Sequence, residues 1–251
     1  MNSAASLLFA PGDRPDKRAI AAFAGANPSF AVSLDPTAGS AAGGGGTGDG
    51  QGNWLELLAN GLTFDLVGLA PGAASDVPPR GHMFGLPEEF ETARMEAVRL
   101  QPGPHLAEGR AMLPVVRSLA WLAAQLAGMP GTRAVAWHAA RSWCATGQYR
   151  DSVLRWIEGG VFPGLGLAAL VPTPDGGMHS QGLALFTGQE LRLEPDLASD
   201  RATGAKIGLR LMHWLVEHGR LEAPERIPGP DGEPLRMEPS SNGRFVRVWR
   251  G

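Results

Sequence analysis

The stretch from Gly182 to Gly219 constrains the fold most, because it holds the two clearest secondary-structure patterns in the chain. Leucines alternate with other residues across 183–194, on either side of a Thr-Gly-Gln segment. Period-two alternation around a turn predicts a β-hairpin. Ser199 or Asp200 can then cap a long helix that ends before Gly219. The stretch therefore predicts a hairpin with a helix packed across its sheet.

That helix is apolar over most of its circumference. Leu209, Leu211, Trp214 and Leu215 lie in two neighbouring rows, and burial should contribute roughly 1.5–3 kcal/mol per large side chain. The charged residues and His213 recur at spacings of three and four, which places them on one narrow stripe. We interpret this stripe as a solvated face and the helix as part of the core.

Composition limits the class of protein. With 251 residues, 43% of them hydrophobic and 19% charged, the chain can form a sizeable core in one or two domains. A net charge of −3 argues against nucleic acid or an anionic membrane as the general partner. The single cysteine, Cys144, excludes an intramolecular disulfide and is typical of a reducing compartment. No secretory signal or membrane-spanning run is recognisable, so we expect a soluble, cytoplasmic protein.

The chain up to Arg110 has the element order of a split βαβ unit. A low-complexity segment at 36–53, which contains four consecutive glycines, is predicted to be a flexible insertion. Proline followed by two acids at 87–89 predicts the start of a helix that reaches Leu100. The predicted elements are strand 6–10, helix 15–26, strand 30–34, strands 54–58 and 62–69, loop 71–85, helix 87–100 and a weak strand 105–110.

The chain from Thr132 onward repeats that order, and the apolar segment 114–127 predicts a central helix between the two parts. The predicted elements are strand 133–138, loop 139–146, helix 149–157, strand 165–171, the hairpin, the long helix, a proline-rich loop 224–242 and strand 245–249. The predicted fold class is α+β. It consists of two tandem ferredoxin-like halves, residues 1–110 and 111–251, joined by a central apolar helix.

Two segments of the C-terminal half carry a family resemblance. Residues 131–138 read Gly-Thr-Arg-Ala-Val-Ala-Trp-His, and residues 180–191 read Ser-Gln-Gly-Leu-Ala-Leu-Phe-Thr-Gly-Gln-Glu-Leu. Over about 113–218 the chain resembles the bacterial family known as domain of unknown function 4261. Ser180 stands where the family usually has threonine, and Thr187-Gly188 stands where Phe-Gly is common. The family has no established activity, so the resemblance implies fold and bacterial origin but no chemistry.

The best candidate site is the loop after strand 133–138, with Trp137, His138, Arg141 and Cys144. A thiolate stabilised by His138 or Arg141 could act as a nucleophile. Buried cysteines more often pack as small hydrophobic residues, so we favour a structural role. Glu190 is the acid that matches the family. It is interpreted as one half of a cross-strand ion pair or, less favoured, as a carboxylate facing a cleft with His138 or Arg141.

No metal site or cofactor is expected, because the six histidines include no metal-binding pair and the glycine run lacks a phosphate-loop ending. The leading hypothesis is a non-catalytic binding protein whose partner is an unknown protein or a small molecule, with a homodimer among the options. The rival is a small-ligand binder or enzyme with its site near 137–144 and Glu190. A partner-neutralising, immunity-type protein is a third option.

Overall fold

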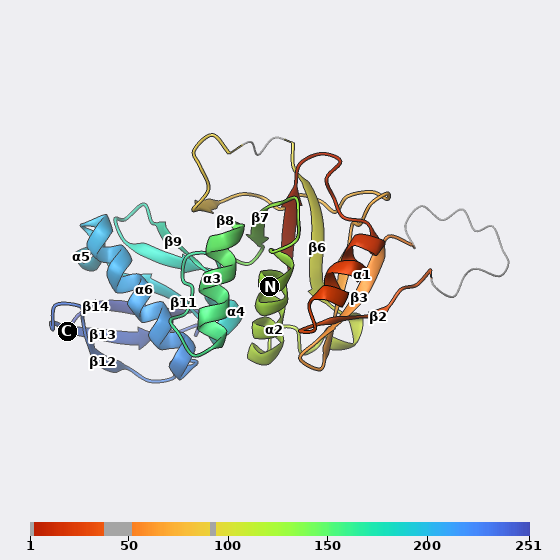
Figure 1. Ribbon diagram of the computed structural model, residues 1–251. Helices are drawn as coiled ribbons and strands as arrows, with labels where there is room; N and C mark the ends of the chain where they lie inside the picture. The colour runs from red at the N-terminus through yellow and green to blue at the C-terminus, as the bar shows by residue number, and fades with distance from the viewer. Residues whose placement is uncertain (1–2, 38–51, 91–93) are drawn as a thin grey trace.

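Two β-sheets with helices between and beside them make up the structure, a computed structural model that describes residues 3–37, 52–90 and 94–251 (Figure 1). The mixed α+β class is therefore confirmed. The predicted flexible insertion at 36–53 lies almost entirely outside the described residues. None of the described helices is long and apolar enough to cross a membrane.

The first sheet has eight strands in the order β2-β3-β4-β6-β1-β7-β8-β5. All neighbours are antiparallel except β5 and β8. Its strands are β1 (Ala5–Phe9), β2 (Ala31–Leu34), β3 (Trp54–Ala59), β4 (Leu62–Val67), β5 (His82–Phe84), β6 (Glu96–Pro102), β7 (Thr132–Trp137) and β8 (Ser142–Ala145).

The second sheet has six strands in the order β12-β13-β14-β11-β10-β9, and only β11 and β14 run parallel. Its strands are β9 (Ala169–Pro172), β10 (Met178–Gln181), β11 (Glu190–Leu193), β12 (Glu225–Pro228), β13 (Pro234–Pro239) and β14 (Phe245–Arg250). The helices are α1 (Lys17–Ala26), the 3-10 turn η1 (Pro104–Leu106), α2 (Leu113–Leu126), α3 (Thr146–Ile157), α4 (Ala184–Thr187), α5 (Pro195–Ala198) and α6 (Arg201–His218).

One continuous core joins the two sheets. The apolar helix α2 packs on β1, β4 and β6 and also contacts α3 and α4, so it lies between the sheets as Figure 1 shows. Helix α6 covers one face of the second sheet, where Leu191 and Leu193 are fully buried against it. Asp200 caps α6 by accepting hydrogen bonds from two backbone amides, as its position predicts. Leu215 is buried as expected, whereas Trp214 is half-buried and stacks on His218.

The division between the sheets differs from the predicted one. Strands β7 and β8 follow residue 110 in the chain, yet they belong to the eight-stranded sheet. The sheets hold eight and six strands, so the tandem ferredoxin-like halves are not confirmed. The change of sheet falls between β8 and β9, because β7 pairs with β1 along the full length of both strands.

The predicted hairpin after Gly182 is wrong. Residues 184–187 form the short helix α4, and the strand that pairs with β11 is β10, which lies earlier in the chain. Leu183, Leu185 and Phe186 are all buried, so the alternation there does not separate a solvent-exposed face from a buried one.

The predicted helix 87–100 is also wrong over its described C-terminal part, which is the strand β6. Val98 and Leu100 face the main core, whereas Ala97 faces a second apolar cluster on the other side of the sheet. Glu96, Arg99 and Gln101 break up the apolar pattern of this strand, so the proline and acids at 87–89 decided the assignment.

Four shorter segments differ as well. Loop 139–146 contains β8, with Trp143 and Cys144 buried on opposite faces. Loop 224–242 contains β12 and β13, whose prolines lie at strand ends, where a missing N–H is tolerated. Loop 71–85 contains β5, strand 165–171 shortens to β9, and the weak strand at 105–110 is replaced by η1.

Candidate functional site

The predicted site residues lie near the junction of the two sheets. His138 and Arg141 are in the turn between β7 and β8, and Glu190 begins β11. Gly182 packs on that turn so closely that a Cβ added to it would lie 2.8 Å from the backbone nitrogen of Ala140. The structure therefore brings the 138–141 turn against the 180–184 segment, where the side chains of His138 and Glu190 are already engaged and that of Arg141 is exposed.

Trp137 is a core residue. It is 1% exposed and stacks on Phe186 with their ring centroids 6.2 Å apart. Phe186 in turn packs against the rings of Trp156 and Phe162. This aromatic cluster fills the space between α3, α4 and the first sheet and leaves no room for a ligand cage.

His138 is held by a buried partner. Its Nε2 lies 2.9 Å from Oγ of Ser6, which is 0% exposed. Burial and, to a smaller extent, the charge of Arg99 lower the pKa of His138 to about 4, so the imidazole is neutral at pH 7. A serine and histidine in contact resemble a catalytic pair, but a substrate cannot reach this hydroxyl.

Arg141 has a structural role through its backbone. Its φ is +51°, and its carbonyl oxygen accepts hydrogen bonds from Gly81 N (2.7 Å) and His82 N (3.1 Å). These bonds hold the start of β5 against the turn.

Cys144 is buried in β8, and burial raises the pKa of its thiol to about 12. Catalytic cysteines need a lowered pKa and an accessible sulfur. Cys144 instead has a raised pKa and a buried sulfur, which disfavours the nucleophile interpretation.

The thiol of Cys144 should not react with a disulfide reagent such as 5,5′-dithiobis(2-nitrobenzoate) in the native protein at pH 8, because its sulfur is covered and protonated. One equivalent should react once the chain is unfolded in guanidinium chloride. Absorbance of the released thiolate measures both reactions. Rapid native modification would restore the nucleophile interpretation.

Glu190 binds the first turn of α4. One carboxylate oxygen accepts from Gly182 N (2.9 Å) and Ala184 N (3.2 Å), and the other accepts from Leu183 N (3.2 Å) and the hydroxyl of Ser180. Burial raises the pKa of Glu190, and these hydrogen bonds partly offset that effect. Glu190 therefore has a structural role that neither sequence interpretation included.

No group of three or more histidine, cysteine, aspartate or glutamate side chains suited to a metal ion occurs in the described part of the chain.

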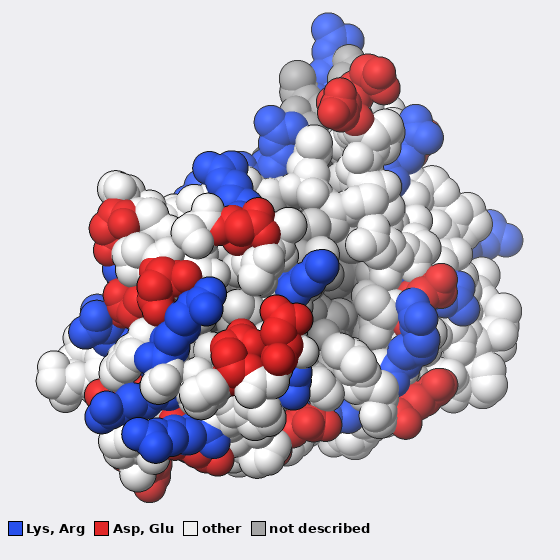
Figure 2. Space-filling view, turned by 90° about the vertical axis from the view of Figure 1, so that its left-hand side faces the viewer, with Lys and Arg blue, Asp and Glu red and all other residues white. Residues whose placement is uncertain are grey.

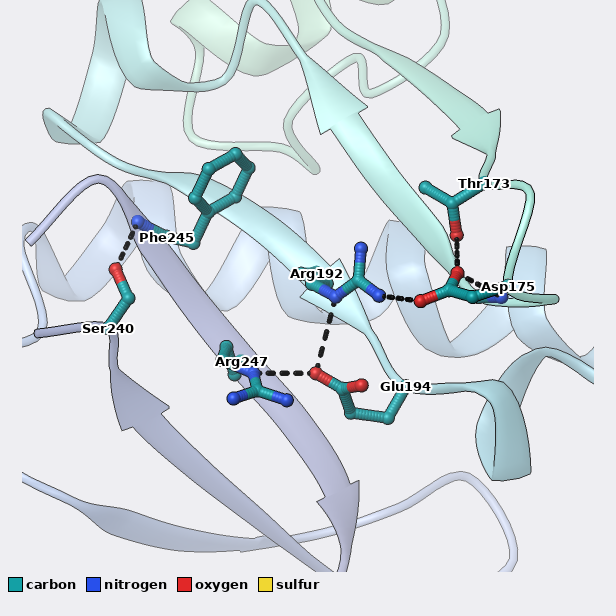
Figure 3. A network of polar contacts seen from close by, with 8 residues as sticks. Thr173, Asp175, Arg192, Glu194, Ser240, Phe245 and Arg247 are labelled. Atoms are coloured by element: carbon teal, nitrogen blue, oxygen red, sulfur yellow. Dashed lines mark hydrogen bonds and ion pairs between the residues drawn. The ribbon is translucent and has the colours of Figure 1, made fainter. Parts of the chain in front are cut away.

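A surface that the sequence interpretation missed lies on the second sheet, on the face opposite α6. We call it the open face, and Figure 3 looks onto it with the helices behind. Period-two register places its side chains on one side of β11, β13 and β14. Its central residues are Arg192, Glu194, Arg236, Arg247 and Trp249.

Glu194 holds two arginines of the open face in place. Its Oε1 accepts from Nε of Arg247 (2.7 Å) and from Nε of Arg192 (3.3 Å), and Arg192 also pairs with Asp175 (Figure 3). The Glu194 side chain is 15% exposed, whereas that of Arg247 is 51% exposed. The acid therefore lies beneath the arginines, and guanidinium groups face outward.

Trp249 lies among these arginines. The guanidinium carbons of Arg236 and Arg247 are 5.6 Å and 5.9 Å from its ring centre, within the range of cation–π attraction. The ring is half-buried. The alternation Leu235-Arg236-Met237-Glu238 was the available signal for this face, but the surrounding prolines led us to predict a loop there.

Comparisons of the chain with protein-family models, with curated proteins and with solved structures find no match. The resemblance to domain of unknown function 4261 therefore stays a prediction.

Proposed function

We propose that this chain is a non-catalytic binding protein that recognises an acidic surface of another protein through its open face. The observation that carries the proposal is the pairing of outward-facing arginines with the half-buried ring of Trp249. Tryptophan and arginine are the residues most enriched among those that dominate binding energy. The engagement of His138, Cys144 and Glu190 within the fold supports binding in preference to catalysis.

Charge on the open face favours an acidic partner. Arg226, paired in register with Arg236, joins the three central arginines. These four cations stand against three acids besides Glu190, whose carboxylate is engaged by the amides of 182–184. Those acids are Asp175, Glu194 and Glu238. Glu194 and Glu238 are less exposed than Arg247 and Arg236, whereas Asp175 is 53% exposed against 24% for Arg192. Around Trp249, the groups that a partner meets first are therefore guanidinium groups.

Pre-organisation should favour affinity, because arginines already held by acids lose less side-chain freedom on binding. Charges of both signs are interleaved over the end of the molecule that holds the second sheet (Figure 2). Such a pattern suits a partner with a matching local arrangement of charges better than a uniformly charged polymer.

A partner-neutralising, immunity-type role would use the same face, and we propose the cytoplasm as the compartment of this protein.

Capture from extracts of the source organism tests this function. Wild-type chain should retain an acidic protein, and a W249A/R236A variant should lose it. Each removed anchor should cost about 2 kcal/mol, or about 30-fold in Kd, when the purified partner is titrated calorimetrically. Arg18→Ala, on an exposed part of α1, is the matched control and should bind like wild type.

Two outcomes would contradict the proposal. In the first, the captured protein binds wild type and W249A/R236A equally well. In the second, sedimentation shows a dimer of the chain that W249A/R236A dissociates, in which case the open face binds a second copy.

A further inference from the structure

A cavity of about 650 Å³ lies at the open end of the β7–β8 hairpin, opposite the 138–141 turn. It is bounded by the end of β1, the start of β7, the β8–α3 junction and residues 85–90 and 94–95. Its volume falls in the range of about 300–1,000 Å³ that small-molecule sites occupy. It is separate from the open face and independent of the function proposed above.

Three large apolar side chains form one part of the cavity wall. Leu86, Phe90 and Met95 line it and also pack on the second apolar cluster around Trp143. Phe90 meets the Trp143 ring edge-on at a centroid distance of 6.4 Å. This part of the wall can receive an aliphatic or aromatic body.

The charged groups among the described lining residues of the cavity are all positive. Arg94 and Arg133 line it, no acid is among its described lining residues, and neither arginine forms an ion pair with an acid that the structure describes. Elsewhere in this protein, most ion pairs join an arginine to a nearby carboxylate, as at Arg14 and Glu96. Arg94 and Arg133, both exposed, instead line the same cavity as Leu86, Phe90 and Met95.

Helix α3 adds to the positive potential at the cavity. It has 12 residues and begins at Thr146, which lines the cavity together with Ala145. Ala145 is the N-cap and supplies no side-chain hydrogen bond to the first turn. An uncapped helix start presents free N–H groups and a partial positive charge. Cations and helix dipole therefore act in the same direction, toward a bound anion.

We propose that this cavity binds a small amphipathic carboxylate. The carboxylate pairs with Arg133 near the start of α3, and the apolar body lies along Leu86, Phe90 and Met95. A single negative charge on an apolar body suits the site because its lining combines two arginines with the apolar side chains of Leu86, Phe90 and Met95.

Fluorescence titration with 1-anilinonaphthalene-8-sulfonate tests the charge requirement on the intact chain. Wild type should bind one equivalent, and Arg133→Ala should weaken binding at least about tenfold, the effect of losing one charge-assisted hydrogen bond. Arg133→Lys, which keeps the charge, should recover part of the affinity. Arg18→Ala should bind like wild type, and Ala145→Leu should weaken binding by filling the cavity.

Competition defines the headgroup. Octanoate should displace the probe from wild type, whereas 1-octanol, which has the same chain length without the charge, should displace it much less. Circular dichroism of each variant checks that the fold is kept. The proposal is overturned if the Arg133→Ala and Arg18→Ala variants bind the probe equally, or if octanol competes as well as octanoate.

Discussion

Replacing Glu190 with alanine should lower the free energy of unfolding by about 3 kcal/mol or more. The carboxylate accepts hydrogen bonds from three consecutive backbone amides and from the Ser180 hydroxyl. Its removal leaves those donors without an acceptor in a largely covered site, at a cost of about 1–3 kcal/mol for each donor that water cannot reach. Urea unfolding followed by circular dichroism measures the loss.

Two variants serve as controls for this effect. Glu190→Gln keeps the size of the side chain but places an NH₂ group against backbone donors, so about half of the loss should remain. Glu222→Ala removes an exposed acid without a described hydrogen bond and should stay within about 0.5 kcal/mol of wild type. If Glu190→Ala unfolds like Glu222→Ala, the carboxylate does not stabilise α4.

The pH dependence of stability gives a second readout. Because the pKa of Glu190 is raised, the folded chain holds its proton more tightly, and this group's contribution falls as pH rises above about 4.5. Asp35 and Asp175 act in the opposite direction, since their pKa values are lowered to about 2 and their contribution is lost as pH falls below 3.8. Glu190→Gln should remove the fall in stability above about pH 4.5 and leave the loss at acid pH that is due to Asp35 and Asp175.

Local signals in the sequence were enough to predict several elements. The Asp200 cap, the strands predicted at 54–58 and 62–69 and the apolar run of α2 each depend on neighbouring residues, and the structure confirms these elements. Strand β6 was missed because Glu96, Arg99 and Gln101 interrupt its buried residues. Its assignment depends on pairing with β1 and β4, which lie elsewhere in the chain.

The roles of the candidate site residues also could not be predicted from neighbouring residues alone. The sequence marked His138 and Glu190 as polar residues in well-patterned segments, but their roles depend on groups far away in the chain. Ser6 reaches His138 across 132 positions, and the acceptor role of Glu190 exists only because residues 184–187 form a helix. The open face was missed because β13, one of its three strands, was predicted to be a loop.

Replacing Gly182 with alanine should cost about 3 kcal/mol or more, because two penalties add. Its φ is +93°, a conformation that strains any residue with a side chain. Its Cβ would also lie 2.8 Å from Ala140 N and 3.0 Å from Ala139 C, both of which are backbone atoms of the β7–β8 turn. Backbone cannot move aside as a flexible side chain does, so the contact between the two sheets must open.

Gly12→Ala separates the two penalties. Gly12 has a similar φ of +84°, but nothing lies within 4 Å of its added Cβ, so only the strain of about 1 kcal/mol should appear in urea unfolding. An equal loss in both variants would mean that the turn yields and that Gly182 is needed only for its backbone angle. The G182A/E190A double variant should lose less than the sum of the single losses, because both residues hold the 180–184 segment. Strict additivity would show that Gly182 and Glu190 act independently, and the segment would then not be a single structural unit.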